Sequence, residues 1–188
     1  MENFSISASS AVGVKFIDPE FVLQQLNIQS GMKIADFGCG AGYFSLALAK
    51  RIGESGVVYA LDILPQSLES VASNAKREKL TNIIAKRVNL ENIDGSKLAA
   101  DSIDLVVLKC MLFQNKKKRD ILTEVARVLK AGGRVVVIEW NMENSAMGPE
   151  RQLRISKEAL LEIAQQAGLS IAGEVNVGNF HYGVVLAK

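Results

Sequence analysis

Short runs of apolar and often β-branched residues recur along the chain, each bounded by glycine, proline or polar residues. Runs of this length and composition are typical of β-strands. The segment RVVVI is continuously apolar, as expected of a parallel strand that is buried on both faces. We therefore predict strands over Lys33–Phe37, Val57–Asp62, Ile84–Val88, Ile103–Lys109 and Arg134–Trp140.

Between these runs the apolar residues recur every three or four positions, which indicates amphipathic helices. The start Asp18-Pro19-Glu20 predicts a first helix continuing through FVLQQLNI, because aspartate caps helices and proline suits their first turn. Further helices are predicted over Tyr43–Arg51, Pro65–Glu78, Lys117–Leu129 and Lys157–Ala167.

Two helix ends carry recognisable signals. Ala131-Gly132-Gly133 is interpreted as the C-terminal stop of the helix over Lys117–Leu129. Ser156 is the expected cap of the last helix, which stops at Gly168. These signals fix where the chain returns to the sheet.

Two final strands, over Ser170–Val177 and His181–Ala187, are separated by too few residues for a crossover. They must therefore run antiparallel to each other. With the preceding alternation of strands and helices, this predicts an α/β fold: a Rossmann-like, doubly wound, seven-stranded sheet, mostly parallel with an antiparallel last strand. We expect one domain over residues 16–188, after a flexible Ser/Ala-rich segment over residues 1–15.

Composition narrows the class of protein. Hydrophobic residues make up 48% of the 188 residues and the net charge is +2, which disfavours nucleic acid and anionic membranes as partners. Only Cys39 and Cys110 carry thiols, which suits a reducing cytoplasm. We expect neither a signal peptide nor a membrane span, because MENFSISASS lacks a basic and an apolar region and no apolar run reaches the length that a span needs. We predict a cytoplasmic protein, and its oligomeric state is not readable from the sequence.

The segment IADFGCGAGYFSLALA places Gly38, Gly40 and Gly42 between a strand and a helix. Glycines at such a turn let a ligand approach the backbone, although a turn without a ligand is the alternative. Asp36 precedes them and would repel a pyrophosphate but suit an ammonium group. Tyr43 stands where a dinucleotide fingerprint needs its third glycine.

Asp62 ends the next strand, about twenty residues after the turn, where a carboxylate can accept both hydroxyls of a ribose. Its alternative role is to cap the helix that begins at Pro65. The pattern as a whole favours a ligand with a ribose and an ammonium group but no phosphate. S-adenosylmethionine meets these conditions.

These motifs resemble those of class I S-adenosylmethionine-dependent methyltransferases, and LKAGGRVVVIEW matches the family phrase at the fifth strand. Asn89 stands where the family usually has aspartate, which changes the expected contact with adenine. The resemblance implies S-adenosylmethionine as cofactor, with S-adenosylhomocysteine as product. The implied cofactor-binding residues are Asp36, Gly38, Cys39, Gly40, Gly42, Asp62, Ile63, Asn89, Leu90 and Lys109.

The segment over residues 16–50, FIDPEFVLQQLNIQSGMKIADFGCGAGYFSLALAK, resembles bacterial methyltransferases grouped with the ubiquinone/menaquinone and arsenite enzymes. Arsenic chemistry is not expected, because arsenite methyltransferases use a set of cysteines and this chain has only Cys39 and Cys110, the first inside the glycine turn. No spacing of residues predicts a metal site.

The substrate is expected at the carboxyl ends of the strands. Trp140 and His181 are the candidate catalytic residues of the acceptor pocket, with plain packing and a structural histidine as alternatives. Tyr182 should face away from His181. Arg151 and Arg154 are interpreted as surface charge, or else as partners of an acidic substrate.

Two further segments have a plain and a functional interpretation. Met111, Leu112 and Phe113 are interpreted as core residues, although they follow the fourth strand near the expected substrate site. The basic run Lys116-Lys117-Lys118-Arg119 is interpreted as a solvated helix start, with contact to RNA phosphate as the alternative.

The predicted function is methyl transfer by direct displacement to a small-molecule acceptor whose identity the sequence does not give. Three alternatives stay open. They are an RNA or protein methyltransferase of the same fold, a nucleotide-binding oxidoreductase, and a catalytically silent cofactor-binding protein.

Overall fold

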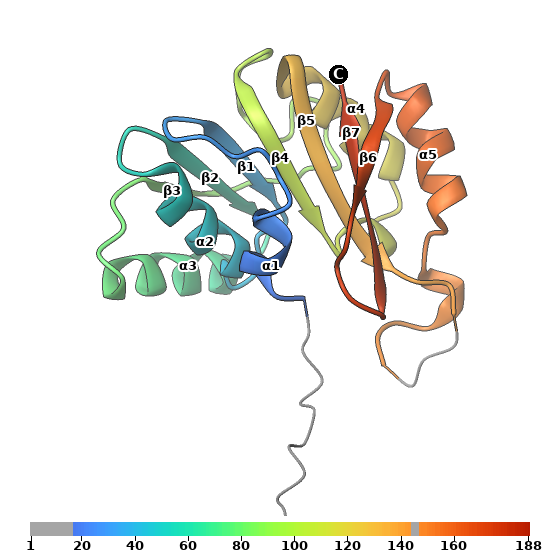
Figure 1. Ribbon diagram of the computed structural model, residues 1–188, viewed down its shortest axis with the longest axis horizontal. Helices are drawn as coiled ribbons and strands as arrows, with labels where there is room; N and C mark the ends of the chain where they lie inside the picture. The colour runs from blue at the N-terminus through green and yellow to red at the C-terminus, as the bar shows by residue number, and fades with distance from the viewer. Residues whose placement is uncertain (1–16, 144–146) are drawn as a thin grey trace, which may run out of the picture.

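A seven-stranded sheet forms the centre of the computed structural model, which describes residues 17–143 and 147–188 (Figure 1). The predicted flexible segment over residues 1–15 lies outside the described residues. The strand order is β3-β2-β1-β4-β5-β7-β6. The strands are β1 Lys33–Phe37, β2 Val57–Asp62, β3 Ile83–Arg87, β4 Ile103–Lys109, β5 Leu129–Trp140, β6 Ser170–Val175 and β7 His181–Ala187.

One strand of the sheet is reversed. The strand β7 runs antiparallel to both of its neighbours, β5 and β6, whereas the pairs among β1 to β5 are parallel. This confirms the predicted fold class. The register places Trp140 directly opposite His181, so the two candidate catalytic residues meet at one edge of the sheet.

Helices cover both faces of the sheet and bury its apolar residues (Figure 1). On one face lie α1, α2 and α3, where Leu48 and Ile52 pack with Ile34 and Val58. On the other face lie α4 and α5. The helices are α1 Pro19–Leu23, α2 Tyr43–Ile52, α3 Pro65–Arg77, α4 Lys118–Val128 and α5 Lys157–Gln166, with short 3₁₀ turns η1 Leu112–Gln114 and η2 Arg151–Leu153.

The glycine pair after α4 has a different role from the predicted one. The helix ends at Val128, and Leu129 already has extended backbone angles and pairs with Ile103. Arg134 then pairs with Leu105, so the residues between form an irregularity inside β5. Gly132, with φ of +75°, allows this bulge. The pair therefore does not cap the helix.

Both α1 and β6 are shorter than predicted, and a side-chain clamp holds the chain where β6 ends. The amide of Gln25 donates to the carbonyls of Phe21 and Asn176, and its oxygen accepts from the backbone N–H of Asn176. These bonds occupy backbone groups of residue 176 that a longer β6 would use for pairing. The chain therefore leaves β6 after Val175.

Candidate functional site

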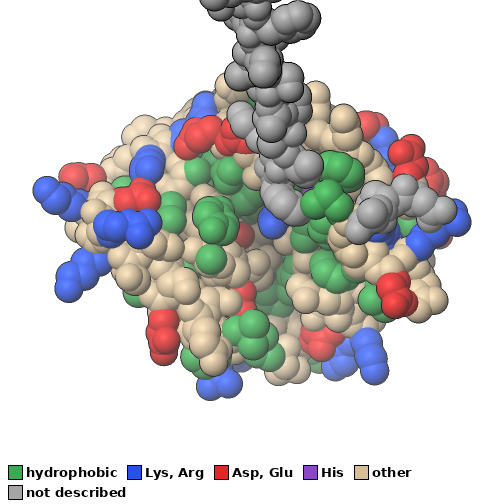
Figure 2. Space-filling view, turned by 90° about the horizontal axis from the view of Figure 1, so that it is seen from below, with side chains coloured by type: hydrophobic (Ala, Val, Ile, Leu, Met, Phe, Trp, Pro, Cys, Tyr) green, Lys and Arg blue, Asp and Glu red, His purple; other side chains and the backbone are tan. Residues whose placement is uncertain are grey.

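A cavity of about 1000 Å³ opens at the carboxyl ends of the parallel strands. Figure 2 looks onto this edge and shows hydrophobic side chains around a hollow. Its wall comes from residues at or after the ends of β1, β2, β3 and β4, from the last residue of β5 and from the first residue of β7. The predicted site residues that line it are Asp36, Gly38, Cys39, Gly40, Asp62, Ile63, Asn89, Leu90, Lys109, Trp140 and His181.

The glycine turn follows β1 as predicted. Gly38, Gly40 and Gly42 all have positive φ, at +74°, +51° and +85°, which glycine tolerates best. The backbone N–H groups of Gly38 and Cys39 donate to the carbonyl of Leu61 at 2.8 and 3.0 Å, which ties the turn to β2. A Cβ atom at Gly40 would meet no atom within 4 Å, so the backbone there borders open space.

Gly42 is the predicted site residue that does not line the cavity. It precedes α2, and a Cβ atom there would lie 2.7 Å from Cγ2 of Val71 on α3. The absence of a side chain therefore lets α2 and α3 approach each other. We conclude that Gly42 serves helix packing.

Asp36 is buried at the end of β1 and accepts a hydrogen bond of 2.6 Å from the hydroxyl of Ser45 on α2. Burial raises the pKa of Asp36 to about 6, although Ser45 and the nearby Lys109 oppose this shift. Lys109 forms no ion pair within the described part of the chain. The carboxylate of Asp36 and the ammonium group of Lys109 lie at the ends of neighbouring strands, where they can bind the ammonium and the carboxylate of an amino acid.

Asp62 ends β2 and holds the loop around it. Its two carboxylate oxygens accept hydrogen bonds of 2.9 Å from the backbone N–H groups of Gly40 and Leu64. The N-cap of α3 is Leu64, whose side chain makes no capping bond, so Asp62 does not cap the helix in the usual way. Each carboxylate oxygen still has a second lone pair for a ligand.

Asn89 and Leu90 follow β3 at the same edge. The side-chain oxygen of Asn89 accepts from the backbone N–H of Glu91 at 3.0 Å, which fixes the turn. Leu90 is buried, whereas Ile63 is half exposed at the mouth. A flat ring bound here would meet apolar surface at Leu90 and Ile63 and polar atoms at Asn89.

Trp140 and His181 form the opposite wall. Their ring centroids are 4.0 Å apart with an angle of 41° between the planes. His181 is the first residue of β7, as the predicted strand over His181–Ala187 places it, and its side chain is buried. Burial lowers the pKa of His181 to about 4, and Lys109 and Arg154 add to the effect. The imidazole is therefore neutral at physiological pH, and its Nε2 has no hydrogen-bond partner among the described residues.

The structure contradicts the interpretation of Arg154 as solvated surface charge. Its guanidinium donates to the carbonyls of Asn141, Glu143, Met147 and Pro149, and it lies 5.8 Å from the centroid of the Trp140 ring. These bonds hold four described backbone carbonyls of the segment after β5 around one guanidinium beside the indole. Arginine suits this position because its fork of donors satisfies several carbonyls at once.

The segment after β4 supplies lining residues that the sequence prediction assigned to the core. Met111 and Leu112 are buried in the core as predicted, and Met111 and Phe113 also line the cavity. A Cβ atom at Gly38 would lie 3.0 Å from Cγ of Met111, so this segment touches the glycine turn. Cys110, which also lines the cavity, has a φ of +50°.

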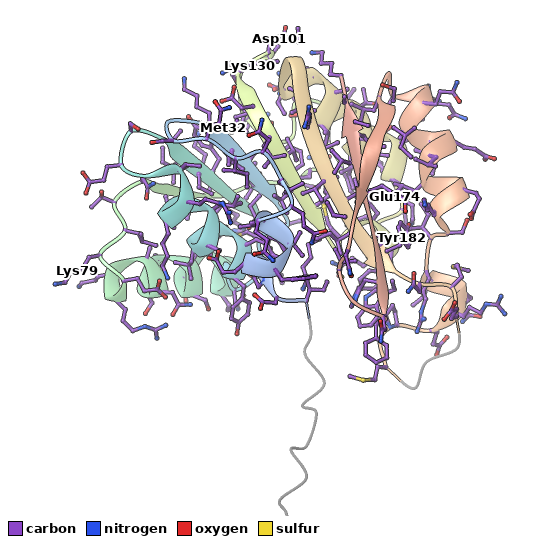
Figure 3. All side chains as sticks on the ribbon, viewed as in Figure 1. Met32, Lys79, Asp101, Lys130, Glu174 and Tyr182 are labelled. Carbon is purple, nitrogen blue, oxygen red and sulfur yellow. The ribbon has the colours of Figure 1, made fainter. Side chains whose placement is uncertain are left out.

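Three other predicted placements are resolved. Tyr182, labelled in Figure 3, faces away from the cavity, and its hydroxyl donates to the carbonyl of Ile155 at 3.0 Å. The basic run lies at the start of α4, where the backbone N–H groups of Lys116 and Lys117 donate to Glu91. It is therefore a helix start, as predicted. Ser45, the partner of Asp36, was missed, although it is a polar residue in the apolar run FSLALA.

The chain was compared with known proteins. A family model described as a methyltransferase domain matches residues 28–173. A demethylmenaquinone methyltransferase from Geobacillus sp. (strain WCH70) is 32% identical over 120 residues, which cover 64% of this chain and 50% of that protein. An arsenite methyltransferase from Halobacterium salinarum is 26% identical over 107 residues, covering 57% and 27%.

A solved structure gives the same result. The SAM-dependent methyltransferase from Aquifex aeolicus superimposes with a TM-score of 0.83 at 26% identity, covering 91% of this chain and 89% of that one. The chain spans about half the length of the demethylmenaquinone methyltransferase it matches. The matched family model, the strand order and the glycine turn agree with one another, and the chain belongs to the methyltransferase domain family.

Proposed function

We propose that this chain binds S-adenosylmethionine and transfers its methyl group to a small-molecule acceptor. The observation that carries the proposal is the cavity at the carboxyl edge of the sheet, where Asp36, Asp62 and the open backbone at Gly40 lie together. Family membership supports the same chemistry. A nucleotide-binding oxidoreductase is disfavoured, because the buried acid at Asp36 would repel a pyrophosphate.

The residues present fit this cofactor. Asp36 has one carboxylate oxygen bonded to Ser45, which leaves the other to accept from the ammonium group. Lys109 would hold the carboxylate, and Asp62 the ribose hydroxyls. Asn89 and Leu90 would border the adenine, with the amide of Asn89 as a donor where relatives of this fold usually present a carboxylate.

S-adenosylmethionine supplies a methyl group that is already activated by the sulfonium. The chain therefore has to orient the acceptor, exclude water and receive a proton where the acceptor carries one. Apolar surface lines the acceptor side of the cavity and comes from Trp140, Met111 and Phe113. His181 is neutral and is the titratable group of this wall that can accept the proton.

An organic acceptor is favoured over a metalloid. Two thiols line the cavity, Cys39 and Cys110, and burial raises the pKa of both, that of Cys110 to about 12. Thiols that stay protonated are poor ligands for arsenic, because the thiolate is the ligand.

No helix in the described ranges is long and apolar enough to cross a membrane. Two free thiols support a cytoplasmic location.

The first test is thermal unfolding with S-adenosylmethionine, S-adenosylhomocysteine and NAD in parallel. A ligand at about 100 times its dissociation constant should raise the midpoint by roughly 5–10 °C. A rise with both adenosyl compounds and none with NAD is expected. No rise with the adenosyl compounds at millimolar concentration would overturn the proposal, and a rise with NAD alone would restore the oxidoreductase.

The second test is turnover with methyl-labelled cofactor. Label is expected to appear in small organic acceptors, and total tRNA and rRNA serve as the competing class. Label transferred to RNA together with a salt-sensitive mobility shift would favour the RNA methyltransferase of the same fold.

A further inference from the structure

Glu139 is a charged residue in the middle of an apolar layer. It lies next to Trp140 in β5, has no exposed surface and does not line the cavity. Its position on β5 places its side chain on the face covered by α4 and α5, opposite Tyr182 of β7. A buried carboxylate is costly unless its oxygens are bonded. The hydrogen-bond partner of the Glu139 carboxylate therefore indicates what the buried charge does in this fold.

That partner is the segment after β4. One oxygen of Glu139 accepts a hydrogen bond of 2.6 Å from the backbone N–H of Leu112, and the amides of Phe113 and Met111 also favour its ionised form. The other oxygen is buried and has no hydrogen-bond partner among the described residues. The carboxylate is thus turned toward the backbone of one short segment.

The same segment shapes the cavity. Met111 contacts the glycine turn at Gly38, and Met111 and Phe113 line the acceptor side together with Trp140. The positive φ of Cys110, a strained value for a side chain of that kind, marks the bend that brings the segment there. A strained bend persists only where other contacts hold it. Glu139 supplies such a contact, because it accepts a hydrogen bond from the backbone N–H of Leu112, a fully buried residue two positions after the bend.

We propose that Glu139 is a positioning residue, whose ionised carboxylate holds the backbone of residues 111–113 and thereby sets the acceptor wall of the cavity. This inference rests on the proposed function for the meaning of the wall. The contact itself belongs to the protein without any ligand.

The ionisation of Glu139 falls in an accessible range of pH. Burial raises its pKa to about 7, against the opposing effects of the three amides and of Lys118 on α4. The other titratable groups that face it are Cys110 and Tyr182, and burial keeps both protonated over this range. A charge-assisted hydrogen bond is roughly twice as strong as a neutral one. While Glu139 stays buried, the segment should therefore be held more tightly above pH 7 than below it, although the cost of burying the charge lowers the stability of the whole fold over the same range.

Trp140 is the only tryptophan of the chain, so its fluorescence reports on this wall. The experiment follows its emission from pH 5.5 to 8.5 in the wild type, in Glu139→Gln and in Glu162→Gln, an exposed acid on α5 as control. A transition near pH 7 is expected in the wild type and the control, and it should vanish in Glu139→Gln. A transition that survives in Glu139→Gln, or none in the wild type, overturns the proposal.

Hydrogen exchange in the wild type keeps the test independent of how well the variant folds. The protection factor of the Leu112 amide, corrected for intrinsic exchange and divided by that of the buried Val107 amide at the centre of β4, should rise roughly fivefold between pH 6 and pH 8. The division removes the change in global stability over this range, and an unchanged ratio would overturn the proposal. The midpoint shift with S-adenosylhomocysteine, measured in parallel on the wild type, reports separately on the proposed function.

Discussion

Asp36 combines burial, a hydroxyl partner and a place beside the glycine turn. If it receives the ammonium group, Asp36→Asn should weaken binding of S-adenosylhomocysteine by roughly 10- to 100-fold, because a hydrogen bond to a charged group is lost. Wild-type affinity should also fall as the pH drops below about 6, where Asp36 becomes protonated. Isothermal titration at pH 5 to 8 measures both effects.

Asp101 offers the matched control for this change. It precedes β4 at the opposite end of the sheet from the cavity, where its ion pair with Lys188 is exposed (Figure 3). Asp101→Asn should leave the affinity unchanged. Equal losses in both variants would show that Asp36 does not contact the ligand.

Two glycines of the turn, Gly40 and Gly42, should differ in the effect of substitution by alanine. Gly42→Ala should destabilise the fold by about 2 to 4 kcal/mol, because a left-handed residue would be strained and its Cβ would press on Val71. Gly40→Ala pays only the backbone strain, of about 1 to 2 kcal/mol, and should mainly weaken ligand binding. Denaturant unfolding and titration with S-adenosylhomocysteine distinguish the two. The same loss of stability at both positions would contradict the assignment of Gly42 to helix packing.

At the scale of elements, the loop between β5 and α5 depends on one side chain. Arg154→Lys should lower the free energy of unfolding by about 1 to 3 kcal/mol, because lysine cannot reach the same set of carbonyls with a planar fork. Arg151→Lys, three residues earlier and exposed, is the control and should change little. Urea denaturation followed by circular dichroism measures the difference. If Arg154→Lys leaves the free energy of unfolding unchanged, the hydrogen bonds of Arg154 do not stabilise the loop.

The elements themselves were largely predictable, because they depend on local pattern. The hydrophobic period and the capping residues predicted the strands and helices, and the sequence motifs picked out Asp36, Gly38, Gly40 and Asp62, which do line the cavity. The contact of Gly42 with Val71 was not predictable, because it joins elements that are distant in sequence. The sequence does contain a hint of Glu139, since it is the acid in the apolar run RVVVIEW, but its partner Leu112 is 27 residues away.

At the scale of the whole molecule, buried acids set how stability depends on pH. Because the native state raises the pKa of Glu139 from 4.5 to about 7, its favourable contribution is greatest below pH 4.5 and is lost as the pH rises through 7. The free energy of unfolding of the wild type should therefore fall relative to that of Glu139→Gln between these values, by on the order of 3 kcal/mol. Asp36 and His181 titrate in both proteins and cancel in the difference. Parallel denaturation curves at pH 5 and 8 check this, and a constant difference would refute it.

The place of β7 in the sheet has a consequence for synthesis of the chain. β7 follows β6 in sequence but lies between β5 and β6, so β6 has no neighbour in the sheet until β7 has left the ribosome. The glycine turn, Asp62 and Asn89 all precede β4 and can associate earlier during translation. The wall that contains His181 is completed last, so a nascent polypeptide passes through a stage in which the glycine-turn side of the cavity is formed and the side beside β7 is unfinished.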